Sequence, residues 1–310
     1  MLRGMSCESA PSFPPPALIR PAAEASAPSK PAARRGFLRY RADWWSIAWV
    51  QLTIGFSLAA WVFDLPLWAM ALLALPVFFF RSSCAYVQHN QGHLPVFRSR
   101  VLNFLYDMQL ALMTGYVTPI WELQHSRGHH RYYLQPARDP ASILDPKTDA
   151  PMARWRYCLF GNLKIVQDAF RVGRSEAREG RPDPRPRMVL HLVVATALAA
   201  TLLYLNWFAF VCFIAIPCVS TGWFVWHISY DHHLGIPMTN HYDGSKTHLG
   251  HSFNRLTFNI GHHAAHHEKP TLHWSLLPKR SAEVLHKLDP ATVSGTLEPE
   301  VAQYVRAAQA

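Results

Sequence analysis

Four long apolar runs constrain this chain more than any other feature of its sequence. They cover residues 44–63, 67–80, 189–205 and 208–226. A helix of about 20 apolar residues crosses the hydrocarbon core of a bilayer, and inside that core only helices and closed barrels satisfy all backbone hydrogen-bonding groups. The connections within each pair of runs are very short, at Asp64 and at Asn206. The runs therefore predict an all-α integral membrane protein whose four transmembrane helices form two hairpins.

Charge and aromatic residues agree with a membrane location. Charged residues make up 16% of the chain, against about 25% in soluble domains. Trp44, Trp45 and Trp61 lie at the ends of the first run, as in the aromatic belts of membrane proteins. The net charge of +10 reflects an excess of lysine and arginine, which is typical of the cytoplasmic loops of membrane proteins. No nucleic-acid-binding motif accompanies the arginines, so nucleic acid is not a predicted partner.

The segment between the hairpins divides into an apolar and a polar part. Residues 101–120 are apolar, but Asn103, Asp107, Gln109 and Pro119 interrupt them. This pattern predicts an interfacial or re-entrant helix and not a fifth span. Residues 131–187 are polar and rich in arginine, which predicts a cytoplasmic segment. Because each hairpin returns the chain to its starting side, both ends of the chain are also expected in the cytoplasm.

The outer parts of the sequence differ from its centre. Residues 1–40 are rich in proline and alanine, lack the apolar core of a signal peptide, and are predicted to be disordered. Residues 41–285 are expected to form one membrane domain, and residues 286–310 a polar cytoplasmic tail. The five cysteines are scattered and form no C-x-x-C pair, so a disulfide scaffold is not predicted.

Eighteen histidines are present, and eight of them fall into three groups that follow apolar segments. The groups are His89 and His93; His125, His129 and His130; and His263, His266 and His267. Residues three or four apart share one face of an α-helix. A structural zinc ion takes four ligands and a catalytic zinc ion three, so eight histidines predict two metal ions. We expect a helical cytoplasmic cap to bring the groups together.

Imidazole is a good ligand for iron, zinc, copper and nickel. Iron is the preferred candidate because a site beside a bilayer has an apolar substrate at hand and O2 as an oxidant. A lone histidine, His191, near the start of the third run is interpreted as structural.

The three groups, interleaved with two hairpins, resemble the histidine boxes of the membrane fatty acid desaturase and hydroxylase superfamily. The resemblance extends from Trp44 to Pro278. NIGHHAAHH followed by KPTLHWSLLP is similar to box three of bacterial fatty acid desaturases, and HNQGHLPVFRSRVLN resembles their box one with the segment after it. The resemblance implies a di-iron, O2-dependent enzyme in which all eight histidines bind iron, with no further catalytic residue.

A ninth ligand is implied after the fourth run, where the family has Asn-x3-His. This chain has SYDHHLGI there, so Ser229 stands in the place of asparagine and His233 in that of the ligand. His232 is the competing residue, and His227 is the next candidate. Carboxylates commonly orient metal-bound histidines, and Asp107, Glu122 and Asp231 lie near the boxes. An ordinary solvated or capping role is the alternative for each.

Two further histidines, His262 and His273, are expected to form outer hydrogen bonds. Asp139-Pro140 and Asp145-Pro146 are interpreted as turns.

The implied reaction is desaturation of an acyl chain carried by a lipid, by acyl-carrier protein or by coenzyme A. A hydroxylase, an acetylenase or a carotenoid ketolase is the same-fold alternative. A histidine-rich metal transporter is disfavoured, because transporters carry ionisable residues inside their spans. The chain has no four-cysteine iron site, haem segment or GxGxxG motif. Electrons are therefore expected from an external ferredoxin-, rubredoxin- or cytochrome-type carrier and its reductase. The expected location is a bacterial inner membrane, with the active site on the cytoplasmic side.

Overall fold

The computed structural model describes residues 36–63 and 65–296. The expected disorder of the N-terminal segment falls almost entirely outside this range. The turn residue Asp64 and the end of the predicted C-terminal tail also lie outside it.

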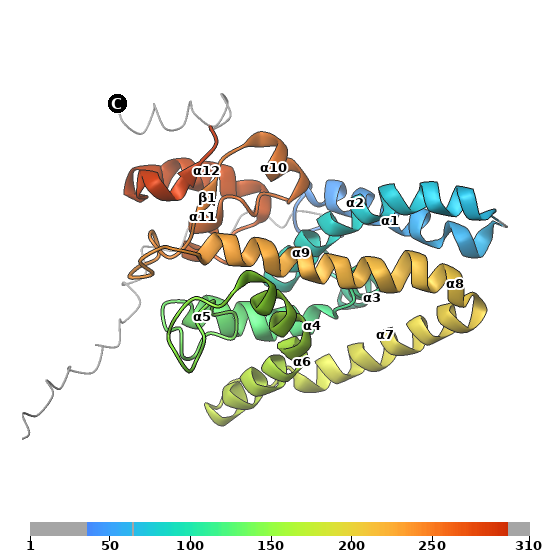
Figure 1. Cartoon of the computed structure of the whole chain (residues 1–310), viewed down its shortest axis with the longest axis horizontal. Coiled ribbons are helices and arrows are strands. Elements are labelled where there is room, and N and C mark those ends of the chain that lie inside the picture. The colour runs from blue at the N-terminus through green and yellow to red at the C-terminus, as the bar shows by residue number, and fades with distance from the viewer. Residues whose placement is uncertain (1–35, 64, 297–310) are drawn as a thin grey trace, which may run out of the picture. The chain divides into compact units, whose positions relative to one another are not determined.

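The described chain is mainly helical (Figure 1). In chain order the helices are α1 (Asp43–Val62), α2 (Leu67–His93), α3 (Arg100–Thr114), α4 (Thr118–Trp121), the π-helix η1 (Glu122–His129), α5 (His130–Tyr132), α6 (Arg154–Arg178), α7 (Arg185–Leu205), α8 (Trp207–Phe210), the π-helix η2 (Val211–Ala215), α9 (Ile216–His233), α10 (His251–Leu256), α11 (His263–Glu268), the 3-10 helix η3 (Trp274–Leu276), α12 (Leu277–Val284), and the 3-10 helices η4 (Leu285–Lys287) and η5 (Pro290–Thr292). Two short strands, β1 (Thr247–His248) and β2 (Val293–Ser294), pair in parallel. This pairing joins the segment at Val293–Ser294 to the segment that precedes α10.

Four helical segments are long and apolar enough to cross a membrane, as the sequence predicts. They are Asp43–Val62, Leu67–His93, Arg185–Leu205 and Trp207–His233. In α1 the buried stripe consists of small or medium side chains at helical spacing, including Ser46, Thr53 and Ser57, and it packs against α2 and α3. Other large apolar side chains of α1, such as Leu52, are exposed. Membrane helices commonly pack in this way, because small residues let the backbones approach closely.

Two of these segments are longer than a bilayer requires. Leu67–His93 and Trp207–His233 each have 27 residues, which corresponds to about 40 Å of helix against a hydrocarbon core of about 30 Å. The apolar runs end at residues 80 and 226, and the same helices continue beyond them to His93 and His233. Their last turns therefore extend beyond the length that a bilayer core covers.

A charged side chain, Arg81, lies inside this bundle, one residue beyond the apolar run 67–80. Arg81 of α2 is fully buried. Its guanidinium donates to the carbonyls of Met113 (2.8 Å), Leu112 and Phe213. The first two carbonyls lie at the C-terminal end of α3, and Phe213 lies in the π-helix η2. Helix ends and π-bulges leave carbonyls without their usual partners, so Arg81 joins α2 to two irregular backbone segments.

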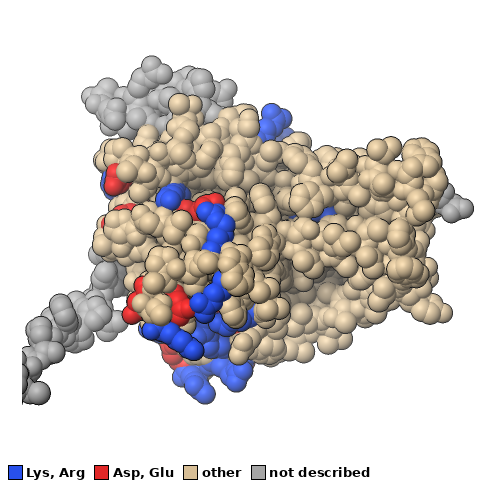
Figure 2. Space-filling view, in the orientation of Figure 1, with Lys and Arg blue, Asp and Glu red and all other residues tan. Residues whose placement is uncertain are grey.

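The arginine-rich segment contains α6, a 25-residue helix that the sequence analysis did not predict. Its buried face includes Tyr157, Ile165 and Val172, and it packs against η1 and α9. Trp155 and Leu163 on another face are exposed. Charged side chains gather near α5 and α6 on the face in Figure 2, whereas the part formed by the long apolar helices is almost free of them.

Candidate metal centre

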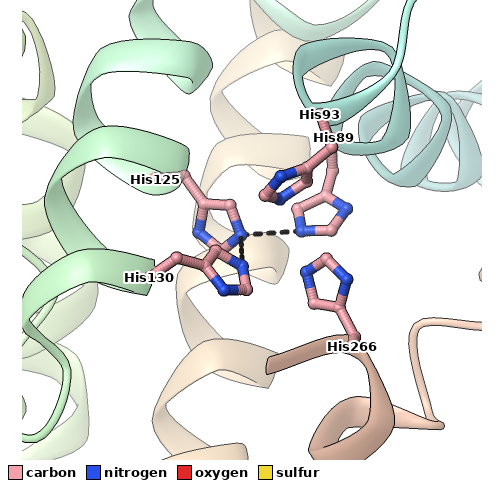
Figure 3. A group of neighbouring side chains, drawn as sticks. All are labelled: His89, His93, His125, His130 and His266. Carbon is pink, nitrogen blue, oxygen red and sulfur yellow. Dashed lines mark hydrogen bonds between the residues drawn. The ribbon is translucent and has the colours of Figure 1, made fainter. Parts of the chain in front are cut away.

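Five histidines from three parts of the chain converge on one point, which we call cluster A (Figure 3). Cluster A consists of His89, His93, His125, His130 and His266, whose available ligand nitrogens all lie within 4.8 Å of one another. The Nε2 atom of His125 is 2.7 Å from Nε2 of His89 and 2.9 Å from Nε2 of His130. Helix α2, the η1–α5 segment and α11 each contribute to it.

A second group lies directly beside the first, and we call it cluster B. His129, His233 and His267 have ligand nitrogens within 4.8 Å of one another. His263 joins them, because its Nε2 atom is 3.1 Å from Nε2 of His267. The two clusters touch where the rings of His130 and His267 lie 4.4 Å apart between centroids. The structure thus brings together all nine histidines proposed as ligands from the sequence.

The π-helix η1 explains how box two, which consists of His125, His129 and His130, supplies histidines to both clusters. The backbone N–H of His130 bonds to the carbonyl of His125, five residues earlier. In an α-helix, residues five apart are rotated by about 140°, whereas a π-turn brings them to nearly the same side. His125 and His130 consequently face cluster A, and His129 faces cluster B. An α-helical register, which the histidine spacing indicated, does not predict that box two is divided between the two clusters.

Box three lies on α11, which has only six residues. So short a helix is unstable alone and depends on its surroundings. Its own residues Ala264 and Ala265 are fully buried, and Phe258 and Asn259 before it adopt left-handed backbone conformations with φ of 50° and 65°. Asn259 is held there by a 3.0 Å bond from its side-chain amide to the carbonyl of Trp274.

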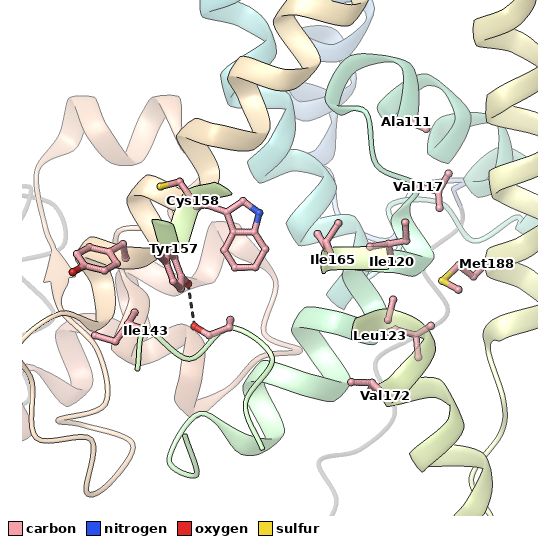
Figure 4. Packing of buried hydrophobic residues seen from close by; sticks show 14 residues of the cluster. Ala111, Val117, Ile120, Leu123, Ile143, Tyr157, Cys158, Ile165, Val172 and Met188 are labelled. Atoms are coloured by element: carbon pink, nitrogen blue, oxygen red, sulfur yellow. Dashed lines mark hydrogen bonds between the residues drawn. The ribbon is translucent and has the colours of Figure 1, made fainter. Parts of the chain in front are cut away.

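A hydrophobic core positions the segment that carries box two (Figure 4). Val117 and Ile120 before η1 and Leu123 within it belong to the same buried cluster as Ile165 of α6 and Met188 of α7. Helix α6 therefore supports the segment that carries His125, His129 and His130.

The chemistry of these side chains fits metal ions. Burial, reinforced by neighbouring histidines, lowers the pKa of five rings that lie outside the spans well below the ordinary value of 6.5. They are His125, His130, His263, His266 and His267. These imidazoles are therefore neutral at physiological pH, as ligation requires. The Nε2 atoms of His93 and His266 are buried without a hydrogen-bond partner. Two nitrogens bound to one ion at about 2.1 Å and at right angles lie about 3 Å apart, close to the spacings given above.

Outer hydrogen bonds orient two rings of cluster B. Nδ1 of His129 lies 2.9 Å from a carboxylate oxygen of Asp139, and Nδ1 of His233 lies 2.9 Å from the carbonyl of Gly244. Such partners fix the tautomer, so that Nε2 carries the free lone pair. The sequence analysis interpreted Asp139 only as a turn residue. It does form that turn, since it accepts a bond from the N–H of Ala141, and it also holds His129.

The three carboxylates proposed from the sequence have other partners in the described chain. Asp107 contacts His191 and Gln91, which supports the structural interpretation of His191. Glu122 pairs with Arg127 and Arg187. Asp231 pairs with Arg154.

Gly128 makes the approach of Asp139 possible. A Cβ atom at this position would meet Cγ of Pro140 at 2.6 Å, so a side chain would push the turn away from η1. The signal in the sequence is Gly128 together with the Asp139-Pro140 pair, which begins ten residues after His129. This signal can be recognised only once the two segments are known to be in contact.

The remaining histidines proposed from the sequence lie outside the clusters. His232 stacks on His263 with 4.1 Å between centroids, and His227 lies 3.1 Å from Arg154. Ser229 bonds to the hydroxyl of Tyr157. His273 bonds to Asp43 and Ser275 and to no clustered histidine. His262 is buried immediately before α11.

A largely apolar pocket reaches both clusters. Its walls include Tyr86, Trp121, Val225, Trp226, Ile228 and Ile260, together with His89 and His125 of cluster A and His129, His233 and His263 of cluster B. The pocket can therefore bring an apolar chain next to the clustered histidines.

Asp139 offers a direct test of the outer hydrogen bonds. We expect Asp139→Ala to weaken metal binding by about 10- to 100-fold, because outer partners of ligating histidines contribute that much. Asp145→Ala is the matched control, since Asp145 also precedes a proline and caps a turn but contacts Arg156. Iron retained by each purified variant under competition with a chelator measures the effect. Equal retention by the two variants would contradict the role given to Asp139.

The sequence matches the family model described as Fatty acid desaturase over residues 65–294, a segment that contains all nine clustered histidines. It is also similar to the sphingolipid delta(4)-desaturase DES1 of Drosophila melanogaster. The two are 25% identical over 241 residues, which cover 71% of this chain and 69% of the relative.

Proposed function

Because this chain belongs to the fatty acid desaturase family, we propose that it is a membrane-bound, di-iron enzyme that uses O2 to introduce a double bond into an acyl chain. The observation that carries this proposal is the pair of adjacent histidine clusters at the wall of one apolar pocket.

We propose that the five histidines of cluster A hold one iron ion. His129, His233, His263 and His267 of cluster B hold the other. When bound, the iron pair supplies the O2 chemistry that removes hydrogen from an unactivated methylene. Zinc is a poor alternative because it has no redox chemistry.

The protein's own contribution is to position the chain and exclude water. Trp226 lines the pocket and packs directly on Gly161, where any Cβ atom would overlap the indole. The indole therefore has little freedom to move, and it forms a firm apolar wall opposite the histidines. Such a wall holds a flexible chain in one place without offering it a hydrogen bond.

The balanced reaction converts one CH2–CH2 unit and O2, with two electrons and two protons, into one CH=CH unit and two molecules of water. We propose that the electrons come from an external ferredoxin-, rubredoxin- or cytochrome-type carrier. The acyl group arrives on a lipid, on acyl-carrier protein or on coenzyme A. The similarity to a sphingolipid desaturase adds sphingolipids to these candidates.

We further propose that the two pairs of spans form hairpins and that the clusters face the cytoplasm. The lengths of α2 and of Trp207–His233 support this arrangement, since both end at clustered histidines on the same side. The charged side chains around α5 and α6 support the cytoplasmic assignment, because cytoplasmic segments carry an excess of lysine and arginine.

Cysteine labelling in sealed cells tests this topology. In a variant without the native cysteines, Ala137→Cys should react with a membrane-impermeant maleimide only after permeabilisation, and Tyr204→Cys should react in intact cells. Both positions are exposed, whereas Gly128 and Ala265 inside the boxes are buried. Labelling of Ala137→Cys in intact cells would overturn the proposed orientation.

The lipid and free-acid profile of a host that expresses the protein tests the activity. Mass spectrometry should show acyl chains that have lost two hydrogen atoms. Gain of one oxygen atom would indicate the hydroxylase alternative, and an unchanged profile in a host with a suitable electron donor would oppose enzymatic function.

A further inference from the structure

The pocket beside the histidine clusters contains buried polar groups that no residue in the described ranges 36–63 and 65–296 satisfies. Tyr86, Trp121 and Gln124 all line it, and they are only 5%, 7% and 2% exposed. The hydroxyl of Tyr86, Nε1 of Trp121 and Nε2 of Gln124 have no hydrogen-bond partner. Buried polar groups in folded proteins are almost always bonded, so three unmade bonds in one ligand pocket point to a missing partner.

The three groups share one chemical property, which is that each can donate a hydrogen bond. An indole N–H is only a donor, the amide nitrogen of glutamine donates, and a phenol can do so. A saturated hydrocarbon segment accepts none of these bonds. An oxygen atom with free lone pairs, in a carbonyl or a hydroxyl group, accepts them.

The donors lie close to the expected site of reaction. The ring of Trp121 is 6.1 Å from that of His89 and 5.9 Å from that of His125, between centroids. Gln124 immediately precedes His125 in η1. An oxygen bound by these donors would therefore lie beside cluster A and beside any carbon held there.

Gln88 shows that a buried side-chain amide near the pocket can form its hydrogen bonds with other groups of the protein. It is fully buried on α2, close in sequence to Tyr86. Its Nε2 donates to the carbonyl of Tyr116 at 2.5 Å, and its Oε1 accepts from the hydroxyl of Thr114 at 2.7 Å. The protein leaves Gln124 without such a partner where the side chain meets the pocket.

We infer that the substrate carries a hydrogen-bond-accepting oxygen, either a carbonyl or a hydroxyl, beside the carbons that are oxidised. This inference rests on the proposed function and narrows its substrate class. It assigns the reaction to the head-group end of an acyl chain, or to a chain bearing an oxygen substituent, and not to an unsubstituted mid-chain segment. Tyr86, Trp121 and Gln124 are the residues that select this substrate.

Equilibrium binding tests the inference without turnover. The ligands are octadecane and the positional octadecanones from octadecan-2-one to octadecan-9-one, which move one carbonyl along an otherwise identical chain. The iron-loaded protein is used in detergent without a reductant. At least one octadecanone should bind about tenfold or more tightly than octadecane, because a site built to hydrogen-bond a ligand rejects the analogue that lacks the group.

Variants then identify the donors. Trp121→Phe and Gln124→Met should each reduce this preference several-fold while the affinity for octadecane and the iron content stay unchanged. Two independent variants keep the test valid if one of them fails to fold. Tyr86→Phe should also reduce the preference, and Tyr106→Phe is its matched control, since Tyr106 is also buried but does not line the pocket. Each variant is compared with wild type for the same pair of ligands, so differences in how octadecane and the octadecanones partition into detergent cancel.

Two results would overturn the inference: no octadecanone binding better than octadecane, or a preference that survives loss of the donors. Neither result bears on the proposed function, which depends on iron and on formation of a double bond. Conversely, an unchanged acyl profile in the expressing host would reject the function whatever the binding preference.

Discussion

His266→Ala is expected to abolish acyl oxidation and to lower bound iron from about two ions per chain to one or fewer. His266 is the one residue of box three that belongs to cluster A. Its ring is almost completely buried, and its Nε2 atom has no partner in the protein. His129→Ala should have the same effect through cluster B. The reason is that each ion loses one of its proposed ligands.

Membrane insertion should remain normal in both variants, because α11 and η1 lie outside the four apolar spans. His286→Ala is the control, since His286 is exposed and lies outside both clusters. Iron analysis, product analysis and the amount of protein in the membrane fraction measure the outcome. Full iron content in His266→Ala would contradict the assignment of cluster A.

His233→Ala and His232→Ala should behave very differently although the two residues are adjacent. His233 belongs to cluster B, and the bond between its Nδ1 and the carbonyl of Gly244 directs the other nitrogen inward. His232 stacks on His263 outside the cluster. We expect His233→Ala to lose the second iron ion and all activity, and His232→Ala to retain both ions.

The reverse result would show that the register at the end of α9 is wrong by one residue. Activity in both variants would remove the ninth ligand from this segment. His227 would be a poor replacement, because it lies beside Arg154 and Asp231. Iron content and product formation, measured on the same preparations, distinguish these outcomes.

The sequence was sufficient to predict the four long apolar helices and the grouping of the histidines because both signals are local. Apolar length predicts a span wherever the chain later goes, and imidazoles at three- or four-residue spacing predict a shared helical face. The distribution of the histidines between two clusters was not predictable in the same way. It depends on the π-turn from His125 to His130, and π-turns are rare within α-helices, so the histidine spacing alone does not indicate one.

Features created by contacts between distant segments were also missed. Asp139 reaches His129 only because Gly128 lets Pro140 pack closely. Arg81 is tolerated inside the bundle only because carbonyls of α3 and η2 face it. Helix α6 was not predicted because the many arginines on its outer faces make the sequence look polar throughout. Its apolar face packs on η1 and α9.

The most direct test of the central claim compares the purified protein loaded with iron or with zinc. Each form is supplied with O2, a one-electron donor system and an acyl substrate identified from the host profile, and the products are analysed by mass spectrometry. We predict that only the iron form yields the acyl chain lacking two hydrogen atoms, with about two iron ions bound per chain, since two-metal sites need both ions. Equal product from the zinc form, which has no redox chemistry, would contradict a di-iron desaturase.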